Sequence, residues 1–217
     1  MRTEYESEPN PGLPGLLPKG ENIIWQGSPN WRVLARTAFH TRLVAGYFAA
    51  LTVYAMGNAL WHGVTGLADL SGVAITLAGA VIGVGLLHLL AWATARATIY
   101  TLTDRRIVLR IGIALPKCIN LPLGIIGNVD LRQRMEGTGD LAIKLTSEQR
   151  LGYAALWPHA RPWQYSNPQP MLRAVPDISA VATLLARACL SIQTDGRVVP
   201  IETATRMTAA TEQAEAA

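Results

Sequence analysis

Charged residues are almost absent from residues 43–95 of this chain, which contain no lysine or arginine and one acid, Asp69. Two apolar runs fill the stretch, 19 residues from Leu43 to Trp61 and 20 residues from Val73 to Trp92. At about 1.5 Å rise per residue, each run is long enough as a helix to cross a hydrocarbon core of ~30 Å. A buried hairpin in a soluble protein is the alternative, but two such runs in tandem are rare there. The sequence therefore predicts a transmembrane helical hairpin over 43–92.

A basic start followed by a short apolar core, the pattern of a secretory signal peptide, is missing from the first 42 residues, so we expect the first span to be retained. The loop 62–72 between the spans lacks lysine and arginine, whereas arginines flank the hairpin on both sides. By the positive-inside bias, this pattern places the loop outside and both termini in the cytoplasm. The flanking arginines, which we expect at the membrane interface, are Arg32, Arg36, Arg42, Arg96, Arg105, Arg106 and Arg110.

Cysteine is scarce, and common catalytic motifs are missing. Cys118 and Cys189 both fall on the predicted cytoplasmic side, where thiols normally stay reduced, and neither belongs to a CxxC or Cys/His cluster. The sequence contains no GxSxG, HExxH or GxxxxGK[ST] motif. The net charge of +4 is modest, and the basic residues lie where topology requires them, which gives no separate case for nucleic acid. We therefore expect a protein that is not an enzyme and uses no cofactor or metal.

Proline and glycine are concentrated before the hairpin. The segment PNPGLPGLLPKG at residues 9–20 has no helical period and predicts an extended arm, assigned to residues 1–30. Ser28, Pro29 and Asn30 then supply helix-start chemistry. Over 31–42, apolar and basic residues fall on different faces, which predicts a short interfacial helix that leads into the first span.

Two features inside the predicted spans suggest contacts. Gly79 and Gly83 have the GxxxG spacing that permits close helix packing, and we expect the two spans to pack on each other there. A homodimer, or contact with another protein, is the alternative for that face. His88 needs a partner in hydrocarbon, and we favour a hydrogen bond to Asn58, Thr52 or a backbone carbonyl over the ligation of a pigment metal.

After residue 95 the apolar pattern becomes alternating, which predicts strands. Residues 97–103 and 106–112 predict a β-hairpin, and an amphipathic helix over 177–190 is expected to close the mouth of a small barrel. The predicted fold class is α+β: a two-helix transmembrane hairpin, then a cytoplasmic antiparallel β-barrel over 96–190 capped by its C-terminal helix. Residues 191–217 lack an apolar period and predict a mobile tail. The remaining strands are predicted at 119–123, 125–131, 140–145 and 152–157.

Several motifs resemble those of the bacterial pleckstrin-homology-like (PH-like) membrane domains. They are GENIIWQGSPNW at 20–31, IYTLTDRRIVLRIG at 99–112, LPLGIIGNVDLRQ at 121–133 and a GxGD turn at 137–140. The PGLPGLLPKG segment, the place of the hairpin and the Pro- and aromatic-rich stretch 157–177 are more narrowly similar to the photosynthetic-complex assembly proteins of purple bacteria. The resemblance implies a non-enzymatic factor of the cytoplasmic or intracytoplasmic bacterial membrane that binds reaction-centre and core light-harvesting antenna subunits.

Three aromatic side chains in this stretch, Trp157, Trp163 and Tyr165, are the candidates for partner contact, because aromatic loop residues supply contact area at low entropic cost. The alternative is that they pack on the barrel. His159 is predicted to be an isolated surface residue. A general membrane adaptor that binds anionic lipid through its arginines is the alternative function, although strand alternation points Arg105 away from its neighbours.

Overall fold

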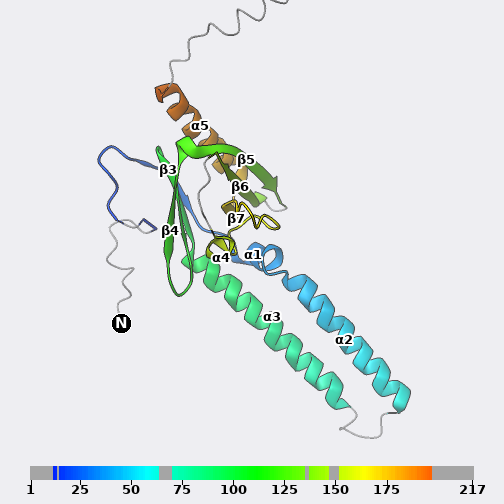
Figure 1. The fold of residues 1–217 in the computed structure, drawn as a ribbon. Helices are drawn as coiled ribbons and strands as arrows, with labels where there is room; N and C mark the ends of the chain where they lie inside the picture. Colours follow the sequence, from blue (N-terminus) through cyan, green and yellow to red (C-terminus); the bar gives the residue numbers. More distant parts are fainter. Residues whose placement is uncertain (1–11, 14, 64–69, 135–136, 147–151, 197–217) are drawn as a thin grey trace, which may run out of the picture.

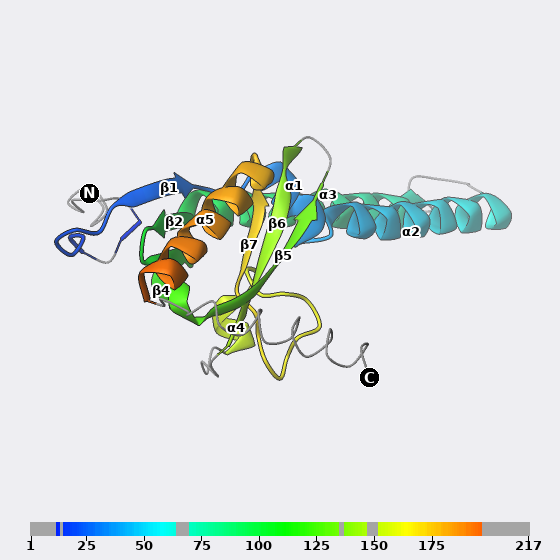
Figure 2. The same cartoon turned by 90° about the horizontal axis from the view of Figure 1, so that it is seen from above.

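The computed structural model describes residues 12–13, 15–63, 70–134, 137–146 and 152–196. Two long helices, α2 (Thr41–His62) and α3 (Ser71–Ala97), run side by side and project from a β domain (Figures 1 and 2). Both are long and apolar enough to cross a membrane, and they contain the two runs predicted from the sequence. Only 6% of the most apolar window of each helix is buried within the chain, so almost the whole apolar surface of the pair faces outward.

The GxxxG face of α3 is in contact with α2. A Cβ atom built on Gly79 would lie 3.3 Å from the Phe48 ring, and one on Gly83 would lie 3.4 Å from the same ring. The two glycines therefore form the shallow surface on which the Phe48 side chain sits. A Cβ atom built on Gly85, on the same helix, would have no neighbour within 4 Å, so Gly85 faces open space.

The β domain consists of two antiparallel sheets. The first has the order β1-β2-β3-β4 and the second has the order β5-β6-β7. The sequence predicted one barrel, but among the described residues no ladder joins the two sheets. The strands are β1 (Ile23–Gly27), β2 (Ile99–Thr103), β3 (Arg106–Ile111), β4 (Lys117–Pro122), β5 (Ile126–Gln133), β6 (Gly139–Leu145) and β7 (Met171–Val175).

The two sheets do not form the single small barrel that the sequence predicted, and a helix packs against both of them. After the short 3-10 turn η3 (Leu123–Ile125), the chain leaves the first sheet and starts the second. The helix α5 (Ile178–Gly196) packs its apolar stripe, which includes Val181 and Leu185, into a core shared by both sheets. The closing helix predicted at 177–190 is therefore present, but it joins two open sheets.

A second, smaller core connects the long helices to the β domain. The helix α1 (Trp31–Thr37) begins at Asn30, whose side chain accepts a hydrogen bond from the Arg32 N–H. Its buried residues Val33, Leu34 and Ala35 pack against α3 and β7. The sequence predicted an interfacial helix over 31–42. The structure instead ends α1 at Thr37, and its apolar face is buried against protein.

Other local predictions had mixed outcomes. The β2–β3 hairpin is confirmed, with Tyr100 opposite Leu109 in an antiparallel register. The strand predicted at 152–157 is wrong, because Tyr153–Leu156 form the short helix α4. The strand β7 was not predicted, and β1 lies within the segment assigned to the extended arm. Residues 1–11 and 197–217, the ends of the predicted arm and tail, lie outside the described residues.

The strand β1 is fixed to the first sheet by an ion pair. The Glu21 carboxylate receives two hydrogen bonds from Arg106, at 2.8 Å from Nε and 3.0 Å from Nη2. Burial alone raises the pKa of Glu21, but the bonds from Arg106 and Thr103 outweigh it and leave this pKa below its usual value. Arg106 is therefore occupied by a structural contact.

Replacement of Gly79 by leucine should separate α2 from α3, because the new side chain would occupy the volume of the Phe48 ring. We expect Gly79→Leu to lower the free energy of unfolding by about 1–3 kcal/mol, measured by SDS titration of the detergent-solubilised chain. Gly85→Leu, in open space on the same helix, is the matched control. Equal losses of unfolding free energy in Gly79→Leu and Gly85→Leu would show that the contact between Gly79 and Phe48 does not stabilise the helix pair.

Candidate functional site

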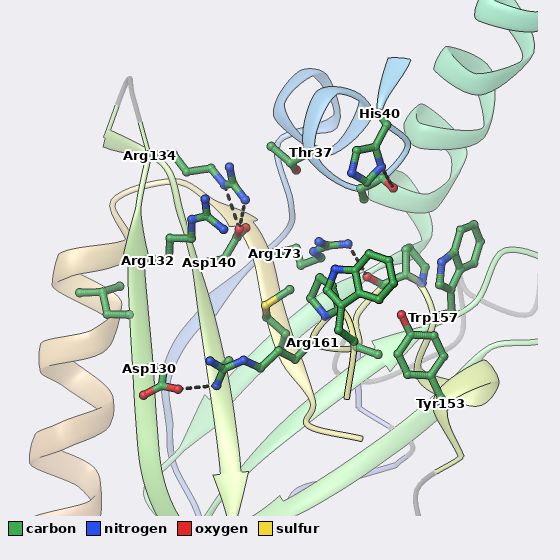
Figure 3. Close-up of a pocket in the computed structure, with 18 of the residues that line it drawn as sticks. Thr37, His40, Asp130, Arg132, Arg134, Asp140, Tyr153, Trp157, Arg161 and Arg173 are labelled. Carbon is green, nitrogen blue, oxygen red and sulfur yellow. Dashed lines mark hydrogen bonds and ion pairs between the residues drawn. The ribbon is translucent and has the colours of Figure 1, made fainter. Parts of the chain in front are cut away.

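A groove lies where the long helices meet the second sheet. Its walls are the α1–α2 corner, one face of β5-β6-β7 and the segment that contains α4 and the aromatic residues after it (Figure 3). Its volume is about 720 Å³, within the range of ordinary ligand sites. Among the residues that line it are Thr37, His40, Asp130, Arg132, Arg134, Asp140, Tyr153, Trp157, Arg161, Trp163, Tyr165 and Arg173.

The floor of the groove follows from strand alternation. Positions two apart on a strand face the same side of a sheet, and the lining residues come in such pairs. They are Asp130 and Arg132 on β5, Asp140 and Ala142 on β6, and Met171 and Arg173 on β7. The sequence held part of the signal for this face, because Asp130 and Arg132 stand two positions apart at the end of a predicted strand, but β7 with Arg173 was not predicted.

Aromatic rings form the outer wall. The Trp157 ring meets Phe39 edge to face at 5.5 Å between centroids, and the Tyr165 ring lies 4.7 Å from Tyr153 and 6.5 Å from Trp163. Trp163 is 84% exposed and Tyr165 is 61% exposed. The backbone of Trp163 has φ +65°, a left-handed conformation that costs a non-glycine residue about 1 kcal/mol or more. The structure thus places the three predicted aromatic residues together on one wall.

The acidic groups of the floor already have partners. Asp140 is buried and accepts hydrogen bonds from the Ala174 N–H at 2.9 Å and from Arg134 Nε at 2.8 Å. Asp130 accepts a bond from Arg161, which also donates to Gln169 at 3.0 Å. By contrast, no ion pair of Arg132 occurs within the described part of the chain.

Arg173 is the most unusual group in the groove. It is only 6% exposed, and its Nη1 donates to the Pro158 carbonyl at 2.9 Å, but its buried Nε has no hydrogen-bond partner among the described residues. Burial lowers the pKa of Arg173, although the nearby Asp140 raises it. The hydroxyl oxygen of Thr37, also buried, has no partner there either. A buried charged donor without an acceptor costs free energy, so an anion that supplied the acceptor would be stabilised in the groove.

His159 lies behind the groove and is fully buried, so its prediction as a surface residue is wrong. Its Nδ1 lies 2.7 Å from the Tyr100 hydroxyl and its Nε2 lies 3.2 Å from the Thr98 hydroxyl. Burial, and secondly the charge of Arg173, lower the pKa of His159 to about 3. The neutral imidazole therefore joins β2 of the first sheet to the segment that precedes β7.

The remaining predicted site residues are dispersed. Arg110 is buried and Arg105 is exposed on the β2–β3 turn. The ring of His88 contacts the Val84 carbonyl of its own helix at 2.8 Å, which is a backbone partner within the helix and not across the hairpin. Four predicted interface arginines are exposed near the domain ends of α2 and α3: Arg32, Arg36, Arg42 and Arg96. In the described ranges, no cluster of three or more His, Cys, Asp or Glu side chains forms a metal site.

Comparison with known proteins extends the similarity across the hairpin and the β domain. A model of the bacterial PH domain family matches residues 45–188, from α2 to α5. A protein of Rhodobacter capsulatus, described as an uncharacterized 23.7 kDa protein in the puhA 5′ region, is 40% identical over 200 residues. The match covers 90% of this chain and 92% of that protein. No solved structure matches the chain significantly.

The buried contacts of His159 predict a large effect on stability. His159→Leu would leave the Tyr100 and Thr98 hydroxyls without this partner, so we expect a loss of about 2–4 kcal/mol in the free energy of unfolding. Denaturant unfolding of the full chain in detergent would measure it. His62→Leu, at the exposed end of α2, should be nearly neutral, and a similar small change at His159 would contradict the burial.

The lowered pKa of His159 also predicts acid sensitivity. Below pH 6.5 the unfolded chain binds a proton at His159, whereas the folded domain does not until about pH 3. Stability should therefore fall as the pH drops from 6.5 toward 3, by up to about 1.4 kcal/mol per pH unit from this group. Unfolding of the wild type between pH 7.5 and 5 should show this slope, and His159→Leu should show a shallower one. Parallel slopes would contradict the assignment.

Proposed function

Because the chain belongs to the bacterial PH domain family, we propose that it is a membrane-anchored, non-enzymatic assembly factor that binds subunits of the photosynthetic reaction centre and its core light-harvesting antenna. The observation that carries the binding role is the aromatic wall of the groove. It exposes Trp157, Trp163 and Tyr165 at the foot of the two apolar helices. Exposed aromatic residues next to arginines have the composition of protein-binding hot spots.

The membrane placement has support from the helices. A pair that is apolar on nearly all sides is stable in lipid, since water would meet the whole surface of α2 and α3. The exposed arginines at the domain ends of these helices favour an orientation with the β domain and both termini in the cytoplasm of the bacterial inner membrane. The groove then opens close to the membrane surface, where it meets the cytoplasmic segments of other membrane proteins.

The photosynthetic assignment has two supports. One is the narrow similarity of the N-terminal segment and of residues 157–177 to photosynthetic-complex assembly proteins. The other is the relative in Rhodobacter capsulatus, whose description places it in the 5′ region of puhA, so this support is one of gene neighbourhood alone. The description of that protein gives no activity.

A general adaptor that binds anionic lipid is the second candidate, and the exposed Arg32, Arg36, Arg42 and Arg96 favour it. The arginines of the first sheet weaken it. Arg106 is paired with Glu21 and Arg110 is buried, so of these three arginines only Arg105 is exposed. Binding to anionic vesicles that does not depend on the aromatic wall would favour the adaptor.

Deletion of the gene in a phototrophic host tests the proposed function. We expect selective loss of the reaction-centre and core-antenna bands in the near-infrared absorption of the membranes, with pigment synthesis intact. Complementation with the wild-type gene should restore the bands. Unchanged spectra in the deletion strain would reject the assembly role and leave the general adaptor.

Removal of the aromatic wall should impair the same process without unfolding the protein. Complementation with Trp163→Ala and Tyr165→Ala together should give reduced bands at a normal protein level, since both side chains are largely exposed. The matched control is Leu115→Ala, an exposed apolar residue between β3 and β4, which should complement fully. Full complementation by the double variant would show that the aromatic wall is not required for assembly.

A further inference from the structure

The inner end of the groove contains a buried cation without a direct counter-charge. None of the ion pairs within the described ranges involves Arg173, and its Nε is buried without an acceptor. The neighbouring acid, Asp140, is paired with Arg134. An acceptor that entered the groove would therefore meet a guanidinium that donates to the Pro158 carbonyl through Nη1 but whose Nε has no acceptor among the described residues.

Two further donors belong to the same groove. The Thr37 hydroxyl comes from α1, across the groove from the sheet, and lacks a partner among the described residues. Arg132 comes from β5 and makes no ion pair in the described part of the chain. The lining contains four arginines against two aspartates, so the groove has an excess of positive charge. Donors from three elements thus converge on a space that favours an anionic, acceptor-rich group.

The outer half of the groove has a different chemistry. Trp157, Trp163, Tyr153 and Tyr165 present ring faces and edges there, and the half-exposed Asp130 on the floor is paired with Arg161. Aromatic rings give contact area to the apolar side chains of a polypeptide, which a phosphate headgroup does not use. A polypeptide with a carboxylate next to apolar side chains matches both halves, whereas a lipid headgroup matches only the inner half.

We infer that this groove receives an acidic, extended segment of a partner polypeptide, with a carboxylate at Arg173, Thr37 and Arg132 and its apolar neighbours on the aromatic wall. The inference deepens the proposed function by naming the chemistry of the partner, and it rests on that function only for the choice of a polypeptide. The carboxylate supplies two acceptor oxygens, which suit the planar fork of an arginine. The aromatic wall supplies apolar contact on either side.

Binding by the full chain in phosphatidylcholine nanodiscs tests the inference. The probes are a short fluorescein-labelled peptide of glutamate and phenylalanine with serine spacers, and the same peptide with glutamine in place of glutamate. Fluorescence anisotropy should show that the glutamate peptide binds about tenfold or more tightly than the glutamine peptide. Equal affinities, or no binding of either peptide, would overturn the inference.

Three variants locate the site. Arg132→Gln is exposed and safe for folding, and Thr37→Val removes a hydroxyl that has no partner in the described ranges, so its stability should be unchanged or higher. Arg173→Lys retains the positive charge but loses the planar guanidinium that can donate two parallel hydrogen bonds. Each variant should lower the affinity for the glutamate peptide by about fivefold or more and leave the affinity for the glutamine peptide unchanged. Arg105→Gln, exposed on the β2–β3 turn outside the groove, is the control, and an equal loss there would indicate nonspecific attraction.

Nanodiscs that also contain phosphatidylglycerol separate the peptide from a lipid occupant. Peptide affinity should fall only modestly, and equally for wild type and Arg132→Gln, if the lipid acts through surface charge. Loss of peptide binding in wild type but not in Arg132→Gln would place the lipid headgroup in the groove and overturn the inference. These binding results do not depend on the deletion phenotype, so a failure here leaves the proposed function testable by itself.

Discussion

The fold depends on one buried polar connection between its two sheets. Tyr100 of β2 contacts His159, and the Arg173 N–H of β7 donates to the same Tyr100 hydroxyl at 3.2 Å. The next residue, Ala174, donates to Asp140 and accepts the Asn30 N–H at the start of α1. Because buried polar groups are costly when unpaired, each of these contacts requires the others. The sheets, α1 and the groove therefore share these contacts, which, together with the core that α5 forms with both sheets, hold the sheets in place although no ladder joins their described strands.

The same connection determines the chemistry of the groove. The side chains of Asp140 and Arg134 are used to hold β6 and the end of β5, and Arg173 is used partly to hold the Pro158 carbonyl. The groups left to bind a ligand are the donors of this network that lack an acceptor and the residues that these structural contacts do not use. Arg132 and the exposed indole of Trp163 are of the second kind. A binding surface built in this way is rigid at its inner end and adaptable at its rim.

The parts that sequence could predict are those with a local signal. The apolar runs, the β2–β3 hairpin with its Thr-Asp-Arg turn and the apolar stripe of α5 are each visible within a few residues of chain. The wrong predictions concern segments whose conformation depends on contacts with residues distant in the sequence. Tyr153–Leu156 form a helix despite an apolar pattern that also suits a strand, and β7 contains Arg173, whose burial depends on partners remote in the chain. His159 was misjudged for the same reason, since both of its partners lie about sixty residues earlier.

A single residue, Thr98, separates the end of α3 from the start of β2. Its side chain is buried and in contact with His159, and α3 is also packed against α1. The junction therefore has no hinge, and α3 at ~40 Å of helix is about 10 Å longer than a hydrocarbon core. In the proposed membrane placement, this excess would hold the groove at a set height above the lipid. For the proposed partner this height would be a geometric condition, because only a segment that leaves the membrane at the matching distance could reach the arginines.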